Sequence, residues 1–200
     1  IQSENIKKQQ KQTRFRQERN SHIMTKIVPL ISSSVAGPLG VLHLPRLWLK
    51  ISLGARGKLA EGYAETKNEN DLDHMVCRAL ELNAPAVAKF ITDSKPTYLQ
   101  FEEWIRLQPG VKLDNVTIRV LNLGISGFVY DIGMAHLVLK TAGITSTDPI
   151  CPIVSDVNNL RDWALFHDAV LLEDEDDATP RPPTWEAATV EGRQSFSIGP

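Results

Sequence analysis

The stretch "GPLGVLHLPRLWLK", residues 37 to 50, decides how the fold of this chain is interpreted. Its second half is apolar, and Pro45 suits the first turn of a helix. Two cations, Arg46 and Lys50, stand four residues apart inside this apolar segment. Because a buried charge is costly unless it is paired, these side chains need solvent, carboxylates or a bound anion around them.

A helix over residues 46 to 60 would be apolar around most of its circumference, which predicts that it is buried on most sides. The remaining wedge of that helix holds Arg46, Lys50, Gly54 and Gly57. A wedge that simply faces solvent is the plainer alternative, since long cationic side chains can snorkel. We nevertheless expect Arg46 to be partly buried and paired with Asp71, with Asp162 or with a bound anion, because helix N-termini already favour negative charge.

Helical periodicity continues toward the C-terminus, with a start or stop signal at most boundaries. Thr97 and Gln100 form a capping box, and Gly143 suits the left-handed residue that closes a helix. The expected helices begin near residues 46, 72, 84, 98, 115, 131 and 159. Together they predict an all-α fold, a compact single domain of six or seven short helices.

The two ends of the chain differ in composition from the part between them. Residues 1–29 are polar and basic, and residues 173–200 begin with the acidic run Glu173 to Asp177 and continue into three prolines. Such segments bury too little apolar surface to offset the entropy of ordering them, so we expect disordered termini around a domain over 30–172. Met24 is the expected natural start.

Composition excludes several classes of function. The net charge of −2 gives no reason to expect nucleic-acid binding, and two cysteines cannot form a disulfide framework. No apolar run approaches the ~18 residues of a transmembrane helix, and the N-terminal residues given lack the apolar core of a signal peptide, so we expect a cytoplasmic protein without a membrane partner. No HExxH, CxxC or glycine-rich phosphate loop occurs, which predicts neither a metal site nor a cofactor.

Several short motifs resemble, in order and spacing, a bacterial family catalogued as domain of unknown function 5069. The motifs are the Gly37 to Lys50 stretch, then Tyr63 and Asp71, then Trp104 and "LNLGI" at 121 to 125, and finally "VNNLRDWALFHD" at 157 to 168. The resemblance spans residues 35 to 172. The family name records no activity, so the resemblance bears on the fold more than on the function.

Four residues are candidates for a functional site. Arg46 would anchor a carboxylate or phosphate in a bidentate fork, Lys50 would add a second charge, and Tyr63 would donate a hydrogen bond. His167 would act as the catalytic acid or base, because histidine titrates near neutrality. The alternative for His167 is a core histidine, since it shares a helical face with apolar residues, and neither neighbouring aspartate has the spacing to orient it.

The sequence is compatible with two functions. The first is the binding or conversion of a small anionic metabolite at Arg46, Lys50, Tyr63 and His167, which requires these four side chains to converge. The second is a non-catalytic interaction module, a homodimer included. The segment "GISGFVYDIGMAHLVL", residues 124 to 139, is the expected self-association face because it is apolar on several sides.

Overall fold

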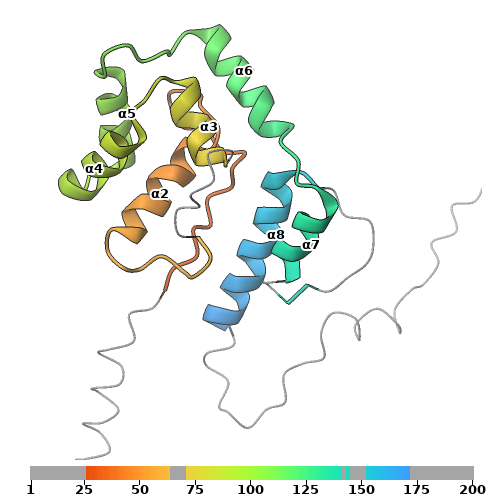
Figure 1. The fold of residues 1–200 in the computed structure, drawn as a ribbon. Helices are drawn as coiled ribbons and strands as arrows, with labels where there is room; N and C mark the ends of the chain where they lie inside the picture. Colours follow the sequence, from red (N-terminus) through yellow and green to blue (C-terminus); the bar gives the residue numbers. More distant parts are fainter. Residues whose placement is uncertain (1–25, 64–70, 141–142, 145–151, 172–200) are drawn as a thin grey trace, which may run out of the picture. The chain divides into compact units, whose positions relative to one another are not determined.

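The computed structural model describes residues 26–63, 71–140, 143–144 and 152–171 (Figure 1). Every secondary-structure element longer than an isolated β-bridge in these residues is a helix. The helices are α2 (Leu44–Gly54), α3 (Leu72–Ala79), α4 (Ala84–Ser94), α5 (Tyr98–Arg106), α6 (Asn115–Ser126), α7 (Ile132–Lys140), α8 (Val154–Phe166) and the π-helix η1 (His167–Leu171). The predicted all-α fold of short helices is therefore confirmed.

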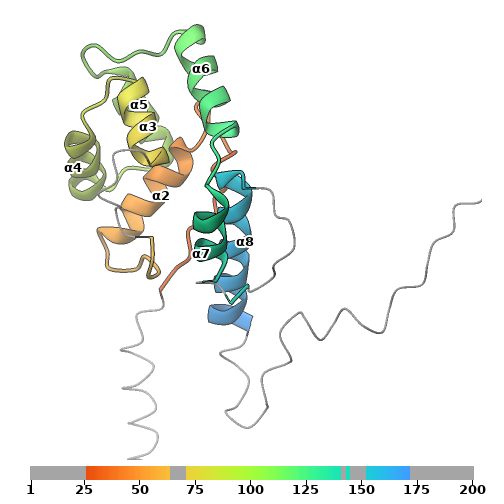
Figure 2. The ribbon, with the colours of Figure 1, turned by 45° about the vertical axis from the view of Figure 1, so that its right-hand side comes forward.

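The chain divides into two compact units, Ile1–Gly127 and Phe128–Pro200. The sequence pattern did not indicate this division. The first unit contains α2 to α6, and the second contains α7, α8 and η1. Within the first unit, α2 packs against α3, α4 and α5, while α6 packs against α3 (Figure 2).

Side-chain caps begin four consecutive helices of the first unit. The capping residues are Asp71 for α3, Asn83 for α4, Thr97 with its capping-box partner Gln100 for α5, and Asp114 for α6. Each cap accepts hydrogen bonds from backbone N–H groups that the first helical turn leaves unsatisfied, and each contributes about 1 kcal/mol. The starts predicted for these helices rest on local chemistry, and the structure confirms them.

Helix α2 is shorter than the predicted 46 to 60. It begins at Leu44, with Pro45 in its first turn, and ends at Gly54. Gly57 then adopts a left-handed φ of 64°, and the Lys58 N–H donates back to the Leu53 carbonyl, so the chain turns away from the helix axis. Gly57 therefore lies outside the wedge in which the sequence placed it.

The loop before α2 is tied to two distant helices. The Leu39 N–H donates to the buried carboxylate of Glu102 on α5 over 3.1 Å. Asn122 on α6 accepts from the Leu42 N–H over 3.0 Å and donates to the Gly40 carbonyl over 2.7 Å. The backbone groups of this loop have no partners within a helix, so these side-chain hydrogen bonds satisfy them and hold the loop in one conformation.

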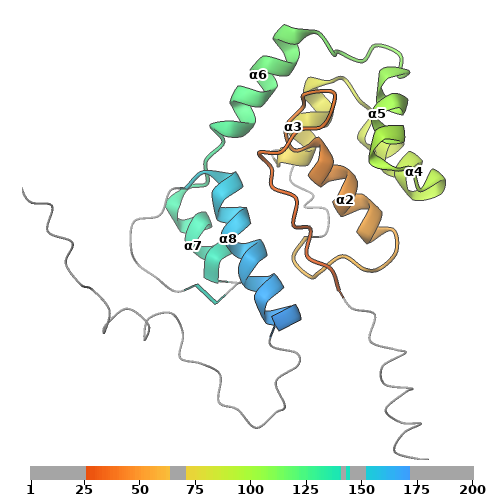
Figure 3. The ribbon, with the colours of Figure 1, turned by 180° about the vertical axis from the view of Figure 1, so that it is seen from behind.

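The segment that precedes this loop runs beside the turn that follows α2 (Figure 3). The Ile27 N–H donates to the Lys58 carbonyl over 2.6 Å, and the Ala60 N–H donates to the Ile27 carbonyl over 3.0 Å. Residues 26 to 31 are thereby attached to the C-terminal side of α2.

The second unit is a pair of helices, α7 and α8, around a small core of Ala135, Leu139 and Val157. Gly143 has a left-handed φ of 77°, and the Ile144 N–H donates to the Leu139 carbonyl, as predicted for the end of α7. Helix α8 begins at Val154 rather than near residue 159. The extended residues just before it pair with the segment that leads into α7, and the helix starts directly after that pairing.

The earlier start of α8 also changes the position of Asp162. The sequence suggested that this aspartate caps a helix beginning near Asn159. In the structure Asp162 lies well inside α8 and is buried, so it is not a capping residue.

Candidate functional site

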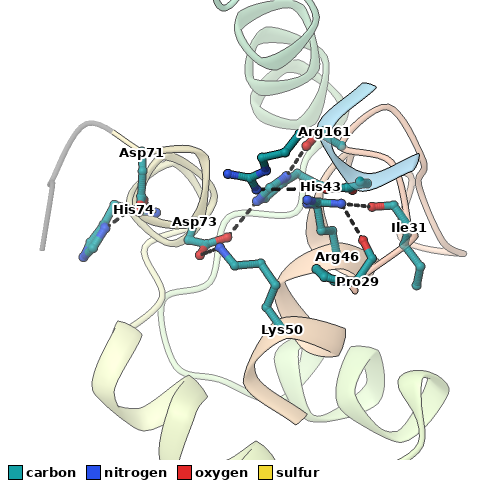
Figure 4. Close-up of polar contacts among 11 residues, drawn as sticks. Pro29, Ile31, His43, Arg46, Lys50, Asp71, Asp73, His74 and Arg161 are labelled. Atoms are coloured by element: carbon teal, nitrogen blue, oxygen red, sulfur yellow. Dashed lines mark hydrogen bonds and ion pairs between the residues drawn. The ribbon is translucent and has the colours of Figure 1, made fainter. Parts of the chain in front are cut away.

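Arg46 is buried near the start of α2, with 2% of its surface exposed. Its Nη1 donates to the backbone carbonyls of Pro29, over 2.6 Å, and Ile31, over 2.7 Å (Figure 4). The expected burial is therefore observed, and the guanidinium satisfies carbonyl groups of the extended segment 26 to 31. The partners expected from the sequence were carboxylates or a bound anion, and these backbone carbonyls were not among them.

Tyr63 is also buried, and it lies beside Arg46. The guanidinium carbon of Arg46 is 5.8 Å from the centroid of the Tyr63 ring, which is within the range of a cation–π interaction. The structure thus brings together two of the four candidate residues. The face of the Tyr63 ring lies beside the guanidinium group of Arg46. The predicted role of the Tyr63 hydroxyl group, as a hydrogen-bond donor to a ligand, stays a prediction.

Lys50 lies one turn after Arg46 and reaches a different partner. Its Nζ donates to Oδ2 of Asp73, in the first turn of α3. The other carboxylate oxygen of Asp73 is 2.7 Å from Nε2 of His43. The Nδ1 atom of His43 is in turn 2.9 Å from Oγ of the buried Ser33. A polar chain of four side chains therefore runs from Ser33 to Lys50 through His43 and Asp73.

The pKa shifts of His43 and Asp73 determine the charges in this polar chain of side chains. Burial lowers the pKa of His43 below its usual value, and the neighbouring Asp73 does not offset this effect. Burial raises the pKa of Asp73, but the hydrogen bond from His43 and the ammonium group of Lys50 together lower it well below its usual range. At neutral pH His43 is therefore uncharged, while Asp73 is ionised and paired with Lys50.

A pocket of about 470 Å³ lies against this chain within the first unit, between α2, α3 and α4. Its apolar wall consists of Leu47, Ile51, Cys77, Ala84, Pro85, Val87 and Ala88. Its polar end consists of Asp71, Asp73 and His74, at the start of α3. Such a pocket, mostly apolar with a few convergent polar groups, is the usual form of a small-molecule site.

Asp71 and His74 form a second polar contact at this end of the pocket (Figure 4). Oδ1 of Asp71 accepts from the His74 backbone N–H over 2.9 Å and lies 2.9 Å from Nδ1 of the His74 ring. Asp71 therefore caps α3 and also presents its carboxylate to the pocket. The sequence suggested Asp71 as a helix cap and as a possible partner of Arg46, and Asp73 as a charge that favours the helix start. Two carboxylates and a histidine within four residues are, in addition, a usable signal for a polar site.

Cys77 lines the pocket but is not a nucleophile there. Burial raises the pKa of its thiol to about 12, and the carboxylates of Asp73 and Asp71 act in the same direction. Since the thiolate is the reactive form, this cysteine stays protonated and unreactive at neutral pH.

His167 belongs to the second unit, in the π-helix η1 that follows α8. The sequence placed it on an apolar helical face. In the structure its side chain is 53% exposed, and its Nδ1 lies 3.6 Å from Oδ1 of Asp168, an aspartate that the spacing had excluded. Leu160, which the sequence placed on the same face, is itself 40% exposed, so the expected buried apolar face does not form there. The convergence of His167 with Arg46 stays a prediction.

No protein-family model, curated protein or solved structure matches the chain. The resemblance to family 5069 accordingly stays a prediction. Among the helices that the structure describes, none combines the length and apolar character needed to cross a membrane. Within the same described ranges, no cluster of three or more histidine, cysteine or acidic side chains has a geometry that could hold a metal ion.

Proposed function

We propose that this protein binds a small molecule, with an apolar body and a hydrogen-bond-donating or cationic head group, in the pocket between α2, α3 and α4. The observation that carries the proposal is the position of two carboxylates, from Asp71 and Asp73, at the polar end of a mostly apolar pocket. A volume of about 470 Å³ falls within the ~300–1,000 Å³ typical of small-ligand pockets.

The negative charge at the polar end of the pocket favours a ligand that donates hydrogen bonds over a ligand that accepts them. Among the described residues that line the pocket, Asp71 and Asp73 contribute two carboxylates, while Lys50 pairs with Asp73 and burial keeps His43 uncharged. A positive head group would therefore gain charge-assisted hydrogen bonds, each contributing about 1.5–3 kcal/mol. The anion proposed from the sequence would have to compete with Asp73 for Lys50, and the Nη1 atom of Arg46 already donates to two carbonyls.

Three probes of similar size separate these alternatives: benzylamine, benzyl alcohol and benzoate. Each would be titrated against the full chain in thermal unfolding and in ligand-detected NMR, because a ligand that binds only the folded state raises the apparent stability. We expect benzylamine to bind about tenfold more tightly than benzyl alcohol, and benzoate to bind weakest. Preferential binding of benzoate would favour the anion site, and no response to any probe would contradict the proposed pocket.

One pair of variants tests the role of the carboxylate. Asp71→Asn removes the charge but keeps an N-cap, since asparagine and aspartate cap helices about equally well. Asp114→Asn is the matched control, because Asp114 caps α6 and does not line the pocket. We expect the preference for benzylamine to fall in Asp71→Asn and to stay unchanged in Asp114→Asn.

Self-association is a second candidate function, with a second copy of this chain as the partner. Val116, Val120 and Leu123 are each more than 60% exposed on α6, and their spacing of four and three residues places them in one stripe. In the second unit, Ile132 and Leu137 on α7 are also exposed. The sequence had favoured the 124 to 139 segment, and Leu123 lies at its edge.

Light scattering over a range of concentrations tests this second function. Leu123→Glu should shift a dimer toward the monomer, because it places a charge in the stripe. Leu107→Glu is the control, since Leu107 is 80% exposed and lies outside the stripe. A parent protein that stays monomeric at high concentration would contradict the proposal.

A further inference from the structure

The hydrogen bonds from Ser33 through His43 to Asp73, within the polar chain described above, have a defined direction. Asp73 is ionised and can only accept hydrogen bonds, so Nε2 of His43 must carry the proton that is donated to Oδ1. His43 is uncharged, so its Nδ1 has a lone pair and must accept from the Ser33 hydroxyl. The geometry therefore assigns the tautomer of His43, and the O–H and N–H dipoles both point toward Asp73.

The three residue types are those of a nucleophilic triad, but their burial excludes that chemistry. Ser33 has an exposed fraction of 0%, and neither Ser33 nor His43 lines the pocket. A substrate in the pocket would meet the Asp73 end of the chain, not the serine hydroxyl. Ser33 and His43 can therefore influence a bound molecule only through the Asp73 carboxylate.

The backbone at His43 is consistent with a side chain held in place from several directions. His43 has a left-handed φ of 67° immediately before α2, a conformation that is uncommon for a residue other than glycine. Its N–H donates to the Val35 carbonyl, and its carbonyl accepts from the Leu47 N–H. Such a conformation persists where the surrounding contacts determine it, and it occurs frequently at functional sites.

We infer that Ser33 and His43 are positioning residues that fix the direction and the charge of the Asp73 carboxylate at the polar end of the pocket. This inference rests on the proposed function of that pocket. Ser33 orients the imidazole, His43 holds one carboxylate oxygen, and Lys50 holds the other. Among the described residues of the first unit, the charged side chains that act on this group are Lys50 and Arg46 on α2, Asp71 at the N-cap of α3 and Asp73 itself.

Two variants interrupt the hydrogen bonds from Ser33 through His43 to Asp73 at different points. Ser33→Ala removes the hydroxyl that orients the ring, and Ser34→Ala, on the exposed neighbouring residue, is its control. His43→Asn keeps an acceptor near Ser33 and tolerates the left-handed backbone, but it loses the donor to Asp73. Ser33→Cys keeps most of the volume and a weak donor, and it replaces Ser33→Ala if that variant does not fold.

NMR of the full chain tests the geometry without any ligand. In the parent, ¹⁵N shifts should show His43 protonated at Nε2 and not at Nδ1 at neutral pH. In His43→Asn, the titration midpoint of the Asp73 carboxyl carbon should rise by at least one pH unit, because one donor to the carboxylate is lost. A proton on Nδ1 of His43, or an unchanged Asp73 midpoint, would overturn the inference.

Probe binding tests the consequence for the pocket. The ratio of benzylamine to benzyl alcohol affinity should fall at least threefold in Ser33→Ala and in His43→Asn, and should be unchanged in Ser34→Ala. If the parent binds benzylamine and both variants keep the ratio, the positioning role is wrong and the proposed function stands. If the parent binds neither probe, the proposed function is wrong, and the NMR titration still decides the geometry of the chain.

Discussion

Gly37 lies directly against the ring of Tyr98. A Cβ atom added at Gly37 would be 2.3 Å from Cε1 of Tyr98 and 2.5 Å from Oε1 of Glu102. The phenol hydroxyl of Tyr98 donates to that same oxygen of Glu102, and burial raises the pKa of Tyr98 above its usual range. The first residue of the stretch 37 to 50 therefore has to be glycine for steric reasons.

Gly37→Ala should destabilise the protein by about 1–3 kcal/mol, the usual effect of overpacking, because Tyr98 and Glu102 would have to move. Gly124→Ala is the matched control. Its new Cβ would meet only Sδ of Met75 at 3.8 Å, and alanine stabilises a helix interior by about 0.5–1 kcal/mol relative to glycine. Urea unfolding measures both, and equal effects at the two glycines would contradict the steric account.

Arg46→Ala should cost about 3 kcal/mol or more, because two carbonyl groups lose a charged donor in a buried place. Arg46→Lys should recover only part of this, since lysine lacks the planar group that lies over Tyr63. Hydrogen exchange at the Ile27 amide should accelerate in both variants, because that amide donates within the attached segment.

Arg56→Ala is the control for Arg46. Arg56 lies just after α2 and is exposed, and its Nη1 donates to the Ser52 carbonyl of that helix. We expect a change within about 0.5 kcal/mol and no effect on the Ile27 amide. Arg46 variants that unfold like the parent would show that the two carbonyl contacts contribute little.

The stability of the protein should decrease below about pH 6.5, partly because of His43. The pKa of His43 is lowered in the folded state, so between the folded and unfolded pKa values the unfolded chain binds a proton that the folded chain does not. Stability then falls with decreasing pH by up to about 1.4 kcal/mol per pH unit from this group. Asp73 adds a second loss near and below about pH 4, where the unfolded chain binds a proton and the folded chain, with its lowered pKa, does not.

Urea unfolding at pH 7.5, 6.5 and 5.5 measures this dependence. His43→Asn lacks the titrating group, so its stability should change less steeply than that of the parent over this range. Parallel pH dependence in the two proteins would mean that other groups account for the loss.

Filling the pocket should abolish ligand binding without unfolding the protein. Ala88→Leu adds apolar volume from the wall of the pocket, whereas Ala86→Leu adds the same volume at an exposed position of the same helix, α4, outside the pocket. We expect Ala88→Leu to lose the thermal response to benzylamine and Ala86→Leu to keep it. Equal responses in the two variants would place the benzylamine site elsewhere.

The features that the sequence predicted well are those with local causes. The capping residues, prolines and glycines that begin and end helices act over three or four residues, so α3 to α6 begin where expected. The start of α8 was wrong because it depends on pairing between two segments more than 20 residues apart. The burial of Arg46 was expected from the apolar residues around it.

The partners of the site residues were much harder to predict. Pro29 and Ile31 reach Arg46 only because the segment 26 to 31 pairs with the turn after α2. His43 and Asp73 are 30 residues apart, and nothing in the helical period indicates that they meet. The pocket therefore became visible only once α2, α3 and α4 were packed together.

The bonds that hold the loop before α2 also set an order of events during synthesis. Leu39 and Leu42 emerge from the ribosome early, yet Glu102 and Asn122, which bind them, lie 63 and 80 residues further along the chain. Helices α3 to α6 each carry their own cap, but with 8 to 12 residues each is only marginally stable before it packs against its neighbours. The beginning of the domain must consequently wait, with its backbone hydrated, until α6 has been translated, and a pause before α6 would prolong the time during which that loop is exposed to proteases and chaperones.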